Sequence, residues 1–157
     1  MQNQSWCLMK RASIEQHGVN RLMITLPLKI LERVRKSDGK EFWFIPNLNS
    51  YTQAAKCTYR RNALKHEFSN LISSLVSHLK PIEGKISLKY TLHPGDKRTR
   101  DLSNVCCIID KYFSDVLSKE GIIEDDNYNF IPRVEYVFGN IDKDNPRCEV
   151  TITRLGE

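Results

Sequence analysis

The chain has 157 residues, and its 24 Lys and Arg residues outnumber its 19 Asp and Glu residues to give a formal charge of +5. A chain of this length can bury a core without disulfides or a structural metal, so a single domain over residues 1–157 is expected. Its 40% hydrophobic and 27% charged residues exclude a disordered or fibrous chain. Because it lacks both an apolar run of about 18 residues and the apolar core of a signal peptide, we expect a soluble cytoplasmic protein that does not span a membrane.

The first part of the chain predicts two strands joined by a basic connection. Asn20–Pro27 and Glu41–Ile45 are rich in β-branched, aromatic and other apolar residues, which is typical of strands. The stretch between them, Lys29–Lys40, contains an Asp-Gly turn and predicts a hairpin-type connection or an insertion. Residues 1–19 would form an N-terminal extension.

The rest of the chain predicts two long helices and three further strands. Pro46–Gln53 has no periodicity and predicts a loop, whereas apolar residues three and four apart predict helices over Thr58–Leu79 and Asp101–Lys119. Strands are expected at Lys85–His93, Arg133–Phe138 and Arg147–Arg154. The expected fold is α+β, in the order ββαβαββ, with a mixed or antiparallel sheet of four or five strands packed against the two helices.

Two groups of basic residues could hold phosphate. Lys97, Arg98 and Arg100 lie in the loop that enters the second long helix, where guanidinium groups and free backbone N–H groups can bind an anion. The second group lies at the start of the other long helix and consists of Lys56, Arg60, Arg61 and Lys65. No acidic residue lies among them, and each phosphate they bound would make DNA binding more salt-dependent. The alternative for both groups is a solvated basic surface.

Two acidic features lie at opposite ends of the second helix. Glu124, Asp125 and Asp126 repel one another unless water screens them or a divalent cation joins them. Asp101 falls at or beside the N-cap, where its alternative role is simply to accept a backbone N–H bond. Together with the basic loop, these acids suit metal-dependent phosphodiester hydrolysis. The helix is about 27 Å long, so such a site requires the loop after Gly121 to fold back beside it.

The sequence resembles a known family at three places: PNLNSY at residues 46–51, RTRDLSN at 98–104 and GIIEDDNY at 121–128. It resembles the RusA family of Holliday junction resolvases, small phage and bacterial enzymes that cut four-way DNA junctions as homodimers with Mg²⁺. The resemblance covers residues 22–154, with an insertion at 29–40. It implies that Asp101 is the first catalytic aspartate, Asn104 the motif asparagine and Asp125-Asp126 the last acidic site, with Asp126 at the catalytic position. Asn47 and Asn49 would orient substrate or position a metal-bound water.

Two positions depart from the family pattern, since Ser103 stands for the second aspartate and Cys107 for the lysine. The helix is also about one turn longer than in the family. Asp110 returns to nearly the face of Ser103, and Lys111 lies one turn beyond Cys107. We therefore hypothesise that Asp110 and Lys111 replace the two missing groups; alternatively, both are solvated helix residues.

These observations predict a Mg²⁺-dependent endodeoxyribonuclease, with Mn²⁺ as a substitute, that resolves Holliday junctions and other branched DNA during recombination, repair and replication. It would act as a homodimer because two symmetric nicks need two sites. Asp101, Asp125, Asp126 and Asp110 would bind metal, and Lys111 or Arg100 would stabilise the phosphorane charge. Two alternatives remain open: a protein of this fold that binds junctions without cutting them, and a small partner-binding domain whose acidic loop is only solvated.

Overall fold

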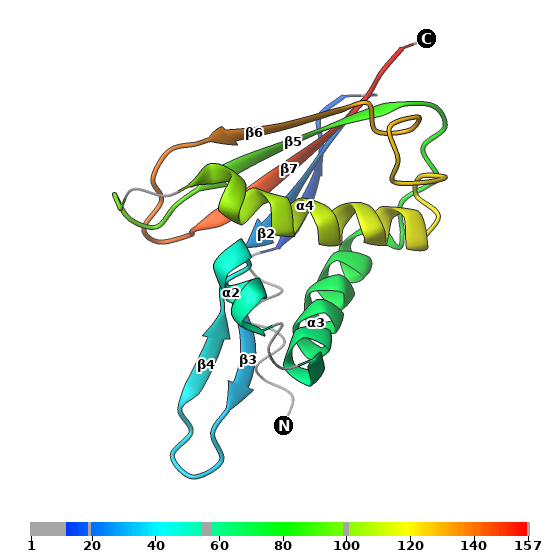
Figure 1. The fold of residues 1–157 in the computed structure, drawn as a ribbon. Helices are drawn as coiled ribbons and strands as arrows, with labels where there is room; N and C mark the ends of the chain where they lie inside the picture. The colour runs from blue at the N-terminus through cyan, green and yellow to red at the C-terminus, as the bar shows by residue number, and fades with distance from the viewer. Residues whose placement is uncertain (1–11, 19, 55–57, 99–100, 157) are drawn as a thin grey trace.

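The computed structural model describes residues 12–18, 20–54, 58–98 and 101–156. In these residues a mixed five-stranded sheet packs against two long helices (Figure 1), which confirms the predicted α+β class. The sheet consists of β1 (Ser13–Gln16), β2 (Arg21–Pro27), β5 (Ile86–His93), β6 (Arg133–Phe138) and β7 (Arg147–Arg154), and the helices are α3 (Thr58–Val76) and α4 (Leu102–Lys119).

The strand order of the main sheet is β1-β2-β7-β5-β6. β5 and β6 run parallel, and the other neighbours are antiparallel. A parallel pair needs a long crossover connection, and here α4 forms part of it. The C-terminal strand β7 lies at the centre, between β2 and β5, so residues from both ends of the chain are joined in one sheet.

The core lies between one face of this sheet and the helices. Alternate residues of β5 are buried there, as the alternation of apolar and polar residues predicts: Ile86, Leu88, Tyr90 and Leu92. α3 and α4 meet them with residues spaced three and four apart, among them Phe68, Ile72, Val76, Ile109, Phe113 and Val116. Each such side chain stabilises the fold by about 1.5–3 kcal/mol when fully buried.

The ends of α4 follow from its sequence. Asp101 is the N-cap, and one of its carboxylate oxygens accepts a hydrogen bond from the backbone N–H of Ser103 at 3.1 Å. Beyond the last residue, Lys119, the chain turns at Gly121, whose φ of +68° is accessible to glycine at little cost. Both limits of this helix agree with the prediction.

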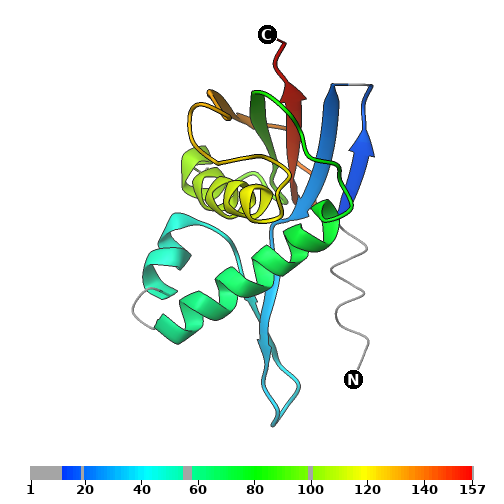
Figure 2. The same cartoon turned by 90° about the vertical axis from the view of Figure 1, so that its right-hand side faces the viewer.

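A second, two-stranded sheet projects from the body of the molecule as a narrow arm (Figures 1 and 2). It is formed by β3 (Ile30–Val34) and β4 (Glu41–Phe44), which pair antiparallel. The predicted hairpin-type connection is thus confirmed, but the strand predicted at Glu41–Ile45 pairs with that connection rather than with the main sheet. The physical reason is proximity along the chain, because the turn closes a local pairing before distant strands can compete.

Two further segments differ from the sequence prediction. α2 (Leu48–Ala54) is a short helix where a loop was predicted, and Tyr51 on it packs edge-on against Tyr112 of α4 with ring centroids 6.4 Å apart. This tertiary contact stabilises a helix too short to show periodicity. Ser13–Gln16, predicted to belong to an extension, is the edge strand β1.

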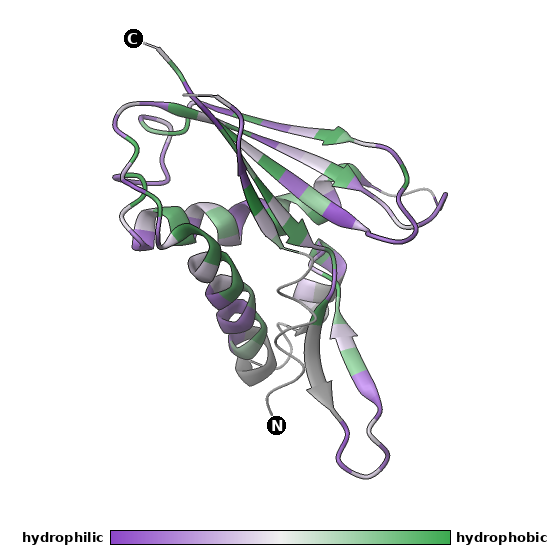
Figure 3. Cartoon of the chain, turned by 180° about the vertical axis from the view of Figure 1, so that it is seen from behind, coloured by the Kyte–Doolittle hydropathy of each residue, from purple (hydrophilic) through white to green (hydrophobic). Residues whose placement is uncertain are grey.

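Hydropathy follows this architecture. The strands of the main sheet alternate between hydrophobic and hydrophilic residues along their length, and the tip of the arm is hydrophilic (Figure 3). In the described part of the chain, no helix has both the length and the apolar character needed to cross a membrane.

Candidate nucleic-acid groove and acidic loop

A polar groove of about 520 Å³ runs between α3 and α4. Helix α3 contributes five residues with helical spacing, namely Asn62, Lys65, His66, Ser69 and Asn70. The opposite wall carries Asp115 and Lys119 from α4, and Asp126 from the acidic loop completes it. The groove therefore combines cationic, amide and hydroxyl groups with two carboxylates.

Asp126 reaches the groove because the loop after α4 folds back along the helix. Ile122 and Ile123 are buried, and the backbone N–H of Ile122 donates to the Leu117 carbonyl at 2.9 Å. The Ile122 carbonyl accepts from the N–H of Ile82 at 2.7 Å, which ties the turn to the segment before β5. This anchored turn directs the following acidic residues back toward α4, as a site built from both segments requires.

Lys111 lies between two carboxylates at this point. Its Nζ is 2.6 Å from Oδ1 of Asp115 and 3.6 Å from Oδ2 of Asp126. The hydrogen bond from Lys111 to Asp115 raises the pKa of the lysine, with a smaller contribution from Asp126. Lys65 adds a second cation, 3.8 Å from the other oxygen of Asp115. The structure thus brings the predicted residues Lys65, Lys111 and Asp126 together.

Asp125 is turned into its own loop. Its Oδ1 accepts a hydrogen bond from the backbone N–H of Asp126 at 2.8 Å, and its Oδ2 accepts from the Asn127 amide at 2.5 Å. Both oxygens therefore order the acidic loop. Glu124, the remaining acid of the run, is exposed.

Asp101 lies at the other end of α4. Besides the capping bond, its Oδ1 accepts from the Ser103 hydroxyl at 2.8 Å, and these bonds lower the pKa of the Asp101 carboxyl. Nine residues further along the helix, Asp110 is already about 14 Å away at the standard rise. Lys111 and its partner Asp126 are therefore far from Asp101. The structure does not bring the two best-matched aspartates together.

Asp110 faces the sheet. Its Oδ1 accepts from the Tyr90 hydroxyl at 2.8 Å and from Ser114 at 3.1 Å, and its Oδ2 accepts from the Tyr136 hydroxyl at 2.8 Å. Burial, followed by the neighbouring Asp110 charge, raises the pKa of Tyr90; burial and the bond to Asp110 raise that of Tyr136. Local spacing predicts a similar face for Asp110 and Ser103, but only the packed sheet supplies these hydroxyls.

The carboxylates named above do not form one ligand set. Within residues 12–18, 20–54, 58–98 and 101–156, no group of three or more His, Cys, Asp or Glu side chains is close enough to hold a metal ion. Among the predicted ligands, Asp126 retains an oxygen not engaged by a hydrogen-bond donor within this part of the chain, whereas Asp101 accepts bonds from Ser103 and from the backbone of Asn104.

The other predicted DNA contacts are scattered or undescribed. Lys97 and Arg98 are exposed in the loop before α4, where Arg98 pairs with Asp96 at 3.8 Å, and Asn49 is exposed on α2. Asn104 lies on the first turn of α4, with a buried side-chain oxygen that accepts no hydrogen bond from the described residues. Arg60 and Arg61 lie in the first turn of α3, and their side chains are not described; Lys56 and Arg100 lie outside the described residues.

Sequence reasoning missed most of the groove. Asn62, His66, Ser69 and Lys119 were not among the predicted site residues. A signal existed on α3, because the polar residues 62, 65, 66 and 69 follow the spacing of one helix face. The opposite wall has no such signal, since it depends on how α4 and the acidic loop pack against α3.

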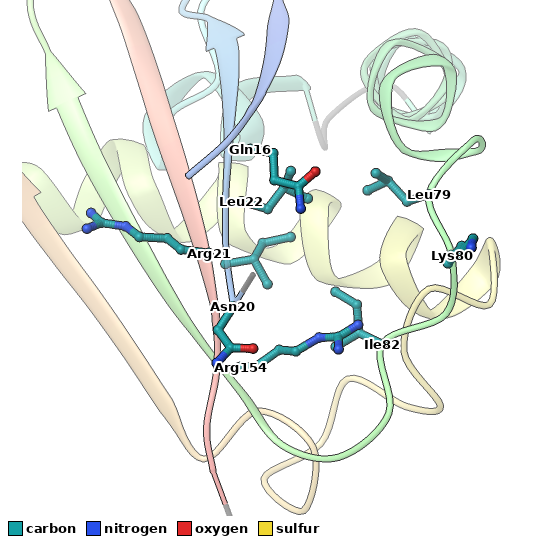
Figure 4. Close-up of a pocket in the computed structure, with 9 residues that line it drawn as sticks. Gln16, Asn20, Arg21, Leu22, Leu79, Lys80, Ile82 and Arg154 are labelled. Carbon is teal, nitrogen blue, oxygen red and sulfur yellow. The ribbon is translucent and has the colours of Figure 1, made fainter. Parts of the chain in front are cut away.

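A second pocket, of about 270 Å³, lies where β1 ends and β2 begins (Figure 4). Its walls combine apolar residues such as Leu22 and Ile82 with the basic residues Lys80 and Arg154, whereas the Arg21 side chain points away from it. No acidic residue is among the described residues that line it. This pocket therefore lacks the carboxylates that metal-dependent hydrolysis would need.

No protein-family model matches the chain, and no curated protein matches it significantly.

Proposed function

We propose that this protein is an endodeoxyribonuclease of the RusA type that resolves Holliday junctions and other branched DNA. One observation supports the proposal most: the acidic loop folds back so that Asp126 lies 3.6 Å from Lys111 at a groove that also contains Lys65. The groove thus joins a carboxylate with cations, which is the combination that phosphodiester hydrolysis uses. Work on DNA in recombination, repair and replication would take place in the cytoplasm of a bacterial or phage-infected cell.

The groove residues supply phosphate contacts in this proposal. Lys65 is exposed and 3.8 Å from Asp115, so its ammonium group can turn to a phosphate at little cost because exposed ion pairs are weak. Lys119 contributes a second cation, and Asn62 and Ser69 offer neutral donors. Lys111 keeps its charge beside Asp115 and Asp126, and in the proposal it stabilises negative charge on the reacting phosphate.

Mg²⁺, with Mn²⁺ as a substitute, is the proposed cofactor. Mg²⁺ is commonly held by one or two carboxylates together with substrate phosphates, and it keeps several waters. Asp126 is the carboxylate best suited to this arrangement in the groove, while Asp101, at the other end of α4, is too far away to bind the same ion and would act only at a separate site. A bound Mg²⁺ would activate water and stabilise the leaving oxygen.

A second candidate is a protein of the same fold that binds branched DNA without cutting it. A specific observation favours it: both oxygens of Asp110 and both of Asp125 accept hydrogen bonds. Together with the separation of Asp101 from Asp126, this leaves no three-carboxylate group in the described residues. The polar groove would then serve for recognition alone.

The proposed homodimer is supported by the edge strand β6. Among the described strands, β6 pairs only with β5, so its other edge is open. Val134 and Phe138 on this strand are 43% and 52% exposed. An open edge with apolar side chains is a natural site for pairing with another strand. The β6 strand of a second copy of the chain would supply that strand.

The test uses a synthetic four-way junction labelled on each strand, with and without Mg²⁺. The wild type is compared with Asp126→Asn, Asp101→Asn and the control Asp144→Asn, which alters an exposed carboxylate outside the groove. We expect Mg²⁺-dependent nicks in the wild type and control and at least a 100-fold slower reaction in Asp126→Asn. Binding without nicks would support the second candidate, and absence of binding would refute both.

A further inference from the structure

We propose that the β3–β4 arm, residues 29–45, is a second DNA-contacting element. It would bind one double-stranded branch of the substrate. The inference rests on the proposed function but uses a different part of the molecule. It assigns a role to the segment that would be an insertion relative to the family pattern. The observations that carry it are the projection of the arm, the order of its tip, and its exposed cationic and aromatic side chains.

The arm extends away from the body of the protein (Figures 1 and 2), and the described residues at its base take part in the core. Ile30 and Phe44, which face each other across the two strands, are 4% and 3% exposed. In contrast, residues 35–41 are all exposed. Arg35 lies five residue steps beyond Ile30, so the extended arm reaches about 17 Å beyond its base.

The tip of the arm is held in one conformation by its own hydrogen bonds. The Arg35 guanidinium donates to both oxygens of Asp38, and Asp38 Oδ1 also accepts from the backbone N–H of Lys40 at 3.2 Å. The backbone N–H of Arg35 donates to the Lys40 carbonyl at 2.8 Å, and Gly39 has a φ of +69° at the turn. An ordered tip loses less conformational entropy when it binds a partner.

The same bonds leave the tip positively charged. Asp38 is neutralised by Arg35 within the turn, while Lys36 and Lys40 are exposed and form no ion pair in the described part of the chain. Over residues 29–45 there are five basic residues against three acidic ones. The excess of positive charge at the far end of the arm suits a polyanion.

Aromatic side chains follow the charged tip. Phe42 lies beneath two cations, with its ring centroid 6.0 Å from Cζ of Arg35 and 5.7 Å from Nζ of Lys40. Trp43 is 42% exposed, although tryptophan is largely buried in most folded proteins. An exposed indole at this position can stack on an unpaired base at a branch point.

Duplex DNA fits this combination of features. A two-stranded β-ribbon is narrow enough to enter the major groove, which is about 12 Å wide. Lys36 and Lys40 at its tip would then contact phosphates, and Trp43 nearer the base would face the branch point. Since the contacts of the lysines are electrostatic, they would add to affinity for any sequence and make binding more salt-dependent.

The experiment measures binding to a four-way junction and to linear duplex by fluorescence anisotropy over a range of salt concentrations, in EDTA to prevent cutting. Wild type is compared with Lys36→Glu/Lys40→Glu and with the control Lys85→Glu/Lys89→Glu. The control alters two exposed lysines near and on β5 and changes the net charge by the same amount. Circular dichroism checks that each variant is folded.

We expect the arm variant to bind about tenfold or more weakly and to reduce the slope of log affinity against log salt by about two, one for each lost phosphate contact. The control should bind within about threefold of wild type. An equal loss of affinity in both double variants would show that only the net charge of the protein matters, and it would overturn the inference. An arm variant that binds like wild type would also overturn it while leaving the proposed function intact; a wild type that binds no DNA would refute both.

A second measurement follows Trp43 directly. The chain has two tryptophans, so a Trp6→Phe variant leaves Trp43 as the only indole reporter. We expect junction DNA to quench its fluorescence and to reduce its accessibility to acrylamide at least twofold. Unchanged fluorescence and accessibility at saturating DNA would show that the arm does not touch the substrate.

Discussion

At the scale of single residues, the Asp110 carboxylate connects α4 to two strands of the main sheet. Its partners Tyr90 and Tyr136 lie on β5 and β6, and Tyr90 is completely buried. A buried hydroxyl without an acceptor is costly, so Asp110 has a structural role whether or not it has a catalytic one.

This role predicts different effects for two substitutions of Asp110. Asp110→Ala should lower the free energy of unfolding by about 3 kcal/mol, because it leaves the Tyr90 hydroxyl without its acceptor. Asp110→Asn keeps one acceptor and should cost about 1 kcal/mol. Urea denaturation measures both. If the folded Asp110→Asn protein cuts junctions at the wild-type rate, Asp110 is not the replacement metal ligand.

Two substitutions can separate the capping role of Asp101 from its proposed catalytic role. Asparagine is about as good an N-cap as aspartate, whereas alanine removes the acceptor for the Ser103 N–H. Asp101→Asn should therefore unfold at nearly the wild-type urea concentration, and Asp101→Ala should unfold at a lower one. If Asp101 binds metal, both variants lose cleavage. Full cleavage by Asp101→Asn would leave Asp101 as a cap only.

The lowered pKa of Asp101 predicts a pH effect of definite sign. Bonds from Ser103 favour the ionised carboxylate, so the folded protein has a lower pKa at this group than the unfolded chain. The resulting stabilisation is fully present at pH values above the ordinary aspartate pKa of about 4. It is lost as the pH falls through the lower pKa of the folded protein. The stability of wild type relative to Asp101→Asn should decrease below about pH 4 in urea titrations. A difference that stays constant from pH 6 to pH 2 would contradict this.

At the scale of the elements, the end of β6 is packed tightly against β5. A Cβ atom added to Gly139 would lie 2.3 Å from an atom of the His93 ring. The ring is constrained, because its Nδ1 is 3.0 Å from the carbonyl of Asn140 and its Nε2 is 3.3 Å from Glu149. The absence of a side chain at position 139 therefore lets β6 and the next loop approach β5.

Gly139→Ala should consequently lower the free energy of unfolding by about 1–3 kcal/mol, the usual cost of overpacking. Gly156→Ala is the matched control, since an added Cβ meets nothing within 4 Å there. The control should stay within about 0.5 kcal/mol of wild type. Equal unfolding midpoints for the two variants in urea would show that the His93 ring moves aside without cost.

At the scale of the whole molecule, the open edge of β6 predicts how two copies would associate. Val134→Lys/Phe138→Lys places charges on the exposed side chains of this edge and should convert a dimer to a monomer in size-exclusion chromatography with light scattering. Leu48→Lys, at a side chain 46% exposed on α2, is the control and should leave the mass unchanged. A dimer that survives the double substitution must use another surface.

The packing of the whole molecule decides which of the proposed site residues lie close enough to act together. Lys111 was chosen because it lies one helical turn beyond Cys107, and the structure brings it to Asp126 because the turn at Ile122 and Ile123 is anchored in the core. Asp110 was chosen by the same spacing, yet the sheet occupies its carboxylate. Spacing along one helix cannot distinguish these two neighbours, since their surroundings come from other segments.

Local patterns were sufficient for the long elements and for most of their limits; the exception is α3, which ends at Val76 rather than at the predicted Leu79. The alternation in β5, the Asp101 cap and Gly121 after α4 act within a few residues of chain, so residue order alone predicts them. The short helix α2, the edge strand β1 and the pairing partner of β4 depend on contacts between segments, and only the tertiary structure decided them. The same holds for the groove between α3 and α4 and for the separation of Asp101 from Asp126, because long-range packing sets the distance between residues on different segments.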